Sequence, residues 1–170
     1  MFSNKVQKAM NTQIKYELES AYIYLSMAAY FESITLPGMA HWMKIQTQEE
    51  IIHAMKFYDF IHDRGGKVEL QTLDQPPVEF ESPLDIYEKA LAHEKKITGN
   101  INDLYALAFE EKDYPSQLLL QWFVDEQVEE ERSASDVVEM LKRVGDDSHS
   151  LLMVDKDLGQ RVLETPGEEE

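Results

Sequence analysis

The stretch QEEIIHAM, residues 48–55, places a carboxylate and an imidazole where a helix should be apolar. The surrounding segment, 38–64, has no internal proline and repeats apolar side chains at alternating steps of three and four. That period is typical of a helix in a bundle. Glu50 and His53 lie within the apolar series, and because buried charges are costly they need partners from other parts of the chain.

Three further segments have the same helical period, at 6–34, 83–111 and 116–144. Glycine and proline separate the four segments, since both residues interrupt helices. The separating residues are Leu36-Pro37-Gly38, Gly65-Gly66, Pro76-Pro77, Pro83, Tyr114-Pro115 and Gly145. A shorter helix is expected at about 148–160, and only 67–80 shows any alternation suited to a strand. The pattern therefore predicts an all-α protein.

The links between the segments predict the topology. The first and second segments are joined by a tight turn, as are the third and fourth, so each pair should be antiparallel. The link at 65–82 can stretch to about 60 Å at ~3.3 Å per residue, whereas each helix spans roughly 40 Å. A bundle with one long crossover needs such a link. We expect a four-helix bundle with one crossover and a short fifth helix over 1–162, then a disordered acidic tail at 163–170.

Each long segment carries a glutamate near the middle of its apolar seam. These residues are Glu17, Glu50, Glu94 and Glu130. Each lies within about three residues, or ~5 Å along the axis, of its helix centre, so helices packed side by side would place the four carboxylates in one layer. His53 follows Glu50 by three residues and shares its helix face. Gln127 and Glu130 have the same spacing.

Four carboxylates in one dry layer cannot all remain ionised without a source of positive charge. The seams contain no lysine or arginine, so a pair of divalent metal ions is the expected source. Oxygen ligands with one imidazole suit iron, manganese or zinc. The expected ligands are Glu17, Glu50 and His53 for the first ion, and Glu50, Glu94, Gln127 and Glu130 for the second, with Glu50 and Glu130 as bridges.

The composition limits the classes of function. The chain of 170 residues has a formal net charge of -17 and no cysteine. An acidic surface repels nucleic acid and anionic membranes and attracts cations, so we expect neither as a partner. The lack of cysteine excludes disulfide scaffolds, thiolate zinc sites and cysteine-held iron–sulfur clusters. The opening residues MFSNKVQKAM lack the apolar region of a signal peptide, and we expect a cytoplasmic protein.

These residues resemble the ferritin family, specifically its non-haem bacterial members, over essentially the whole chain. The matching motifs are Glu17, Glu50-x-x-His53, Glu94 and Gln127-x-x-Glu130 on successive helices. The fold implied is the ferritin-like four-helix bundle, the known case of such a bundle with one crossover. The resemblance also implies a role for Tyr24 beside the iron site. It implies a third iron site held by Glu49, Glu126 and Glu129, with Glu130 shared.

The resemblance implies an iron-storage protein with ferroxidase activity. Such a protein oxidises Fe(II) to Fe(III) with dioxygen or peroxide at the intrasubunit di-iron site. It stores the product as a ferric mineral inside a homo-oligomeric shell of 24 subunits. If exposed, Met39, Trp42 and Tyr58 would suit contacts between subunits. The fifth helix would pack about the family's fourfold axis or onto its own bundle.

Departures from related proteins qualify this expectation. Bacterioferritins carry Glu-x-x-His on two helices, whereas the fourth helix here offers Gln127-x-x-Glu130. They also bind haem through a methionine at the position that Ile52 occupies here, so we expect no haem. Animal ferritins line an iron channel with acids at the start of the fourth helix, which here reads SQLLL at 116–120. The sequence therefore does not identify the route that iron would take into a shell.

Two other functions are compatible with a metal-binding bundle. A peroxide-reducing protein of the rubrerythrin type shares the scaffold but adds a cysteine-ligated iron domain, and this chain has no cysteine. A non-enzymatic protein could instead buffer divalent metal at its acidic surface. Accelerated oxidation of Fe(II), together with a soluble mineral, would distinguish a ferritin from both.

Overall fold

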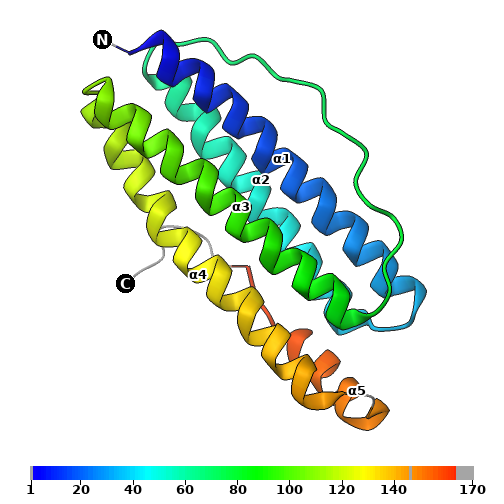
Figure 1. The fold of residues 1–170 in the computed structure, drawn as a ribbon. Coiled ribbons are helices and arrows are strands. Elements are labelled where there is room, and N and C mark those ends of the chain that lie inside the picture. Colours follow the sequence, from blue (N-terminus) through cyan, green and yellow to red (C-terminus); the bar gives the residue numbers. More distant parts are fainter. Residues whose placement is uncertain (1, 146, 164–170) are drawn as a thin grey trace.

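The computed structural model describes residues 2–145 and 147–163, and within them every regular element is a helix (Figure 1). The helices are α1 (Asn4–Ser33), α2 (Pro37–Asp63), α3 (Pro83–Glu110), α4 (Tyr114–Val144) and α5 (Ser148–Leu158). The predicted all-α fold with a short fifth helix is confirmed, and residues 67–80 form no strand. None of the described helices combines the length and hydropathy that crossing a membrane requires. The expected tail lies outside the described residues, except for Leu163.

The connection between α2 and α3 determines the topology. α1 and α2 form one closely packed pair, and α3 and α4 form another. The connecting segment 64–82 runs along α1 from one end of the bundle to the other (Figure 1). Asn11 fixes it there, because its Nδ2 donates to the carbonyl of Lys67 at 3.0 Å and its Oδ1 accepts from the backbone NH of Glu69 at 2.6 Å. The link is therefore a packed crossover.

Short polar side chains mark the starts of four helices. Ser3, Ser82, Asp113 and Asp147 each accept a hydrogen bond from a backbone NH two or three residues further on. Each bond satisfies a donor that the first helical turn leaves free. Gly65 and Gly145 follow α2 and α4 with φ of 70° and 56°, a left-handed conformation that favours glycine. These local signals fix the helix ends and hence the level of each mid-helix residue.

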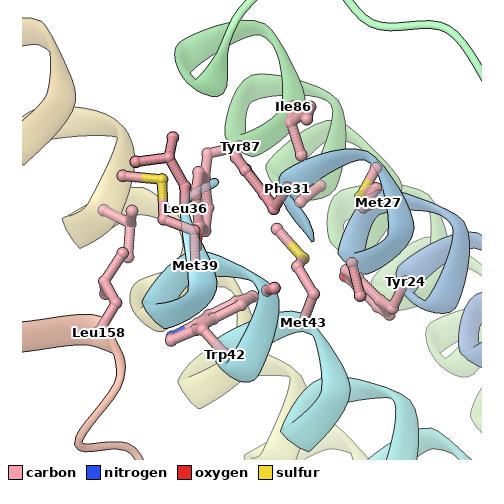
Figure 2. Close-up of a cluster of buried hydrophobic side chains, with 14 of the residues drawn as sticks. Tyr24, Met27, Phe31, Leu36, Met39, Trp42, Met43, Ile86, Tyr87 and Leu158 are labelled. Carbon is pink, nitrogen blue, oxygen red and sulfur yellow. The ribbon is translucent and has the colours of Figure 1, made fainter. Parts of the chain in front are cut away.

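Two apolar clusters fill the interior of the bundle. The cluster near α5 packs Tyr24 and Phe31 of α1 against residues of α2 and α3 (Figure 2). The cluster at the other end contains Phe57 and Phe123, whose rings stack with centroids 4.2 Å apart. The mid-helix glutamates fall between the clusters, so the apolar packing on both sides holds the polar layer in place.

Two of the residues considered for subunit contacts are buried in the subunit itself. Met39 and Trp42 are 0% and 5% exposed and belong to the cluster near α5 (Figure 2). Contact with another subunit was expected only if these side chains were exposed, and they are not. Tyr58 is partly buried against the other cluster.

α5 packs against α2 and α4 of its own chain. Asp155 Oδ1 accepts a hydrogen bond from the backbone NH of Met39 at 2.8 Å, near the N-terminus of α2, where the helix dipole favours a carboxylate. A Cβ atom on Gly38 would lie 1.7 Å from the carbonyl oxygen of Asp155, so this close approach requires glycine. Leu152 and Met153 remain 58% exposed, which leaves part of α5 free of its own bundle.

Candidate metal centre

One glutamate from each long helix enters the gap between the two apolar clusters. The exposed fractions are 1% for Glu17, 2% for Glu50, 1% for Glu94 and 5% for Glu130. The structure therefore buries all four carboxylates that the sequence placed at mid-helix. No lysine or arginine is among the buried side chains of residues 2–145 and 147–163. The acids consequently lack a buried lysine or arginine that could neutralise them.

His53 lies between two groups of metal-ligating atoms. Ligand atoms of Glu17, Glu50 and His53 all lie within 4.8 Å of one another, and so do those of His53, Glu126 and Glu130. The Nδ1 atom of His53 is 3.6 Å from Glu50 Oε2, and its Nε2 atom is 3.6 Å from Glu126 Oε1. His53 therefore faces Glu50 of the first expected metal site with one nitrogen and Glu126 of the expected third site with the other.

Aromatic residues of α4 hold the imidazole of His53 in this position. The ring of His53 meets Trp122 edge-on with centroids 5.5 Å apart, and it meets Phe123 edge-on at 5.8 Å. Such edge-to-face contacts are favourable and orient the ring. The imidazole of His53 is thus preoriented and only 3% exposed.

Residues of α1, α3 and α4 form the other half of the layer. The Nε2 atom of Gln127 donates to the carbonyl oxygen and to Oε2 of Glu94, both at 3.3 Å, and lies 3.2 Å from Thr98 Oγ1. Tyr24 donates its hydroxyl hydrogen to Glu94 Oε1. The amide nitrogen of Gln127 is thus committed to Glu94, and its amide oxygen is the atom that could bind a metal.

Burial favours the neutral form of three of the four layer carboxyls, those of Glu17, Glu94 and Glu130. Burial, together with the charge of Glu50, raises the pKa of Glu17 and of Glu94 from 4.5 to about 8. Burial also raises the pKa of Glu130 well above 4.5, with Glu94 and Glu50 adding to the effect. Desolvation and neighbouring like charges both favour the neutral carboxyl. A metal ion that binds here must therefore displace protons.

His53 and Tyr24 are affected by the same carboxylates. Burial by itself would lower the pKa of His53, but hydrogen bonds to Glu126 and Glu50 raise it well above 6.5. Burial, followed by the charge of Glu94, raises the pKa of Tyr24 well above 10. Tyr24 is therefore a neutral hydrogen-bond donor to Glu94 at physiological pH.

The expected third site is only partly assembled. Glu126 approaches His53, whereas Glu49 pairs with Arg161, whose Nη2 lies 2.6 Å from Glu49 Oε2. Burial raises the pKa of Glu49 to about 7, although the charge of Arg161 opposes this rise. Glu129 is exposed and belongs to neither group of close ligand atoms among the described residues. A cavity of about 370 Å³ lies beside all of these residues.

Three residues in contact with the acids were not assigned a role from the sequence. The Nε2 atom of Gln13 donates to Glu17 Oε1 at 2.9 Å, and that of Gln46 donates to Glu130 Oε2 at 2.6 Å. Each glutamine precedes a layer glutamate on its own helix by four residues, a spacing that puts both on one face, so a signal was present. Arg161 comes from beyond α5, and its local sequence gives no indication of a contact with Glu49.

The fold and the site define the class of protein as a ferritin-like helical bundle with a buried cluster of carboxylates and a histidine that could hold a metal ion. The Ferritin-like domain family model matches residues 7–144. The chain is 42% identical over 161 residues to a bacterial non-heme ferritin of Bacteroides fragilis, covering 95% of this chain and 100% of that protein. For a bacterial non-heme ferritin of Staphylococcus aureus the identity is 35% over 164 residues, covering 96% and 99%. The chain belongs to the ferritin family.

Solved ferritins have the same fold. An open-pore ferritin from the archaeon Archaeoglobus fulgidus matches with a TM-score of 0.95 and 48% identity, over 95% of this chain and 100% of that one. An engineered closed form of that ferritin also matches with a TM-score of 0.95 and 48% identity, over 96% and 100%. The predicted ferritin-like bundle and the predicted family are therefore confirmed.

Proposed function

We propose that the chain is the subunit of an iron-storage protein with ferroxidase activity. The observation that carries the proposal is the buried layer of four glutamates with His53, which has no lysine or arginine among the buried side chains of the described residues. Buried carboxylates are costly unless they are paired, and divalent cations would pair with them in place. Membership of the ferritin family makes iron the expected cation.

Two Fe(II) ions would bind in the two halves of the layer. The proposed ligands are Glu17, Glu50 and His53 for the first ion and Glu50, Glu94, Gln127 and Glu130 for the second. Two-metal sites hold their ions about 3.5–4 Å apart. The amide oxygen of Gln127 is a neutral ligand and weaker than an imidazole, so the second ion is held more loosely. A loosely held ion can leave after oxidation, which suits iron as a substrate rather than as a permanent cofactor.

The proposed reaction takes one electron from each Fe(II). Two Fe(II), one dioxygen and two protons give two Fe(III) and one hydrogen peroxide, and peroxide is the alternative oxidant. The carboxyl groups of Glu17 and Glu94, whose pKa values lie at about 8, would lose their protons when Fe(II) binds. Tyr24 has two roles compatible with its contact to Glu94: it supplies a further electron, or it only orients that carboxylate.

The outer acids form the proposed third iron site. Glu49, Glu126 and Glu129 would bind this ion, with Glu130 shared with the di-iron layer. The 370 Å³ cavity gives the ion room beside His53, and carboxylate oxygens suit iron. Iron leaving the layer could pass through this site on its way to the mineral.

Storage requires a container, which we propose is a cytoplasmic shell of 24 subunits. Large apolar side chains are exposed on the subunit, including Leu118 at 72% and Val128 at 69%, and exposed apolar surface is suited to contacts between subunits. The relative from A. fulgidus is described as an open-pore ferritin. Size-exclusion chromatography with mass measurement tests the shell directly, since 24 copies differ in mass from any small oligomer.

An aerobic iron assay tests the catalytic proposal. Fe(II) is mixed with the metal-free protein, and its oxidation and the particle size are followed together. His53→Ala and Glu17→Gln should each slow oxidation by at least about tenfold, since even outer-shell partners of metal ligands contribute about 10–100-fold. Glu139→Gln, which removes one charge from an exposed side chain, is the matched control and should oxidise iron at the unaltered rate.

The outcomes separate the candidate functions. Rapid oxidation that depends on His53 and Glu17 and yields a soluble mineral supports the ferritin proposal. Binding of iron without accelerated oxidation would instead identify a metal buffer. Oxidation that responds to hydrogen peroxide and leaves no mineral would indicate a peroxide-reducing enzyme.

A further inference from the structure

The chain beyond α5 turns back towards the middle of the bundle (red in Figure 1) and reaches the outer acids. Residues 159–163, which we name the return segment, contain Arg161. The guanidinium of Arg161 donates to Glu49 Oε2 at 2.6 Å and to Gln46 Oε1 at 2.7 Å. It also lies 4.3 Å from the centroid of the Trp42 ring. Its side chain is 19% exposed, so these contacts hold it against the protein.

The backbone of the return segment is fixed at the same place. The Nε2 atom of His41 donates to the carbonyl oxygen of Arg161 at 2.8 Å. The side chain and the main chain of Arg161 therefore both attach to α2, the helix that carries Glu49, Glu50 and His53. The amides of Gly159, Gln160 and Arg161 donate to carbonyl oxygens of α5. Loss of the guanidinium contacts would leave the bond from His41 as the hydrogen bond between Arg161 and α2.

Arg161 also determines how Gln46 meets the metal layer. A guanidinium only donates hydrogen bonds, so the amide oxygen of Gln46 must face Arg161. The amide nitrogen must then face the layer, where it donates to Glu130 Oε2 at 2.6 Å. Arg161 thus acts on Glu130 through Gln46, without touching it. The amide of Gln46, as a donor to Glu130 Oε2, competes with any cation for the lone pairs of that oxygen.

The cavity beside the return segment has the charge of a cation site. Its lining includes Glu49, His53, Glu126, Glu129 and Glu130. Among the described residues that line it, Arg161 is the one lysine or arginine. Glu49 is 8% exposed, so its carboxylate has little access to water. Arg161 therefore occupies a place at Glu49 for which a metal ion in the cavity would compete.

We propose that Arg161 is a displaceable internal cation that closes the outer acidic site until a divalent metal ion enters it. In the closed state the guanidinium neutralises Glu49 and directs Gln46 towards Glu130. A metal ion bound by Glu49 displaces Arg161, releases the return segment and frees the oxygen of Glu130. The inference rests on the proposed function in one respect, which is that the displacing ion is Fe(II).

Binding experiments without oxygen test the competition. Fe(II) is titrated into the metal-free protein, and its third and weakest site per subunit is compared between variants. Arg161→Gln should tighten this site by about tenfold, within the range of ordinary coupling between sites. Arg161→Lys keeps the charge but loses the planar fork that contacts Glu49 and Gln46 together, so it should give a smaller increase. Arg143→Gln removes the same charge from an exposed residue of α4 outside the lining of the cavity and is the matched control.

Hydrogen exchange tests the release of the return segment. Because coupling is reciprocal, Fe(II) should accelerate amide exchange at 159–163 in the unsubstituted protein. In Arg161→Gln these amides should exchange rapidly with or without Fe(II). Amides in the middle of α3 provide the internal reference and should not respond.

Several results would overturn the inference. They are an unchanged third-site affinity in Arg161→Gln, an equal gain in Arg143→Gln, the absence of a third site in both proteins, and a return segment that stays protected when Fe(II) saturates the protein. Each is distinguishable from failure of the proposed function, because rapid oxidation of iron by the unsubstituted protein is measured separately and depends on the inner ligands.

Discussion

Binding of two Zn(II) ions to each metal-free subunit should release several protons, and the number should fall as pH rises through 8. Zn(II) suits the same oxygen and imidazole ligands as iron and has no redox chemistry. Burial keeps Glu17 and Glu94 protonated, with pKa values of about 8, until a cation takes the place of the proton. The proton count therefore reports the state of the layer directly.

The expected count follows from these pKa values. A group with a pKa of 8 is about 0.9 protonated at pH 7 and about 0.5 protonated at pH 8. Glu17 and Glu94 together should release about 1.8 protons at pH 7 and about 1.0 at pH 8. Glu130 and His53, whose pKa values are also raised well above their ordinary values, should add protons at both pH values. The decrease of about 0.8 proton between pH 7 and pH 8 is the signature.

Calorimetric titration in buffers of different ionisation enthalpy measures the count. Glu139→Gln alters an exposed carboxylate and should leave the count and its pH dependence unchanged. A count below one at pH 7 would mean that the layer is ionised without metal. A count that is the same at pH 6.5 and pH 8.5 would show that these carboxyls do not titrate near 8, and either result would refute the reasoning.

The same layer predicts how the metal-free protein responds to pH and substitution. Since the folded pKa values of Glu17 and Glu94 exceed their unfolded ones, the stability they contribute is full below about pH 4.5 and is lost towards pH 8, by up to about 1.4 kcal/mol per pH unit per group. The thermal midpoint should therefore fall from pH 5 to pH 8 and recover with Zn(II). Gly38→Ala puts a Cβ 1.7 Å from a carbonyl oxygen of α5 and should lower the midpoint and speed amide exchange in α5. Gly99→Ala adds a Cβ that would meet nothing within 4 Å beyond its chain neighbours and its own helix backbone, and it should do neither. Tyr24→Phe removes a hydrogen bond that lowers the pKa of Glu94, so the proton count with Zn(II) at pH 8 should increase.

The helices and the layer of buried glutamates could be predicted because their signals are local. Proline and glycine placed the ends of the second helix at 38 and 64, and the structure has Pro37–Asp63. A mid-helix glutamate within an apolar period can be recognised in a single sequence, because a carboxylate at such a position is costly to bury. Four of them, on four helices of similar length, meet because the helices are packed side by side. Nothing beyond spacing and burial was needed to bring Glu17 and Glu50 together.

The contacts made by the end of the chain could not be predicted in the same way. Trp42 is a neighbour of the seam rather than a member of it, and its burial depends on the cluster completed by Leu158 of α5 and on Arg161 over its ring. The pairing of Arg161 with Glu49 joins residues 112 positions apart. Their meeting depends on the direction in which the chain leaves α5, which no local period encodes.

The side chains that donate hydrogen bonds to the layer glutamates are amides, which leave the charge of the carboxylates in place. Each layer glutamate receives a hydrogen bond from a neutral side chain: Gln13 donates to Glu17, Gln46 to Glu50 and Glu130, and Gln127 to Glu94. An amide donor fixes the position of a carboxylate without neutralising its charge. An arginine in the place of Gln46 would supply that charge permanently and would compete with a metal ion at Glu130. Arg161 contacts Gln46 and Glu49 instead. It can therefore orient Gln46 towards the layer without occupying the position of a metal ion among the layer carboxylates.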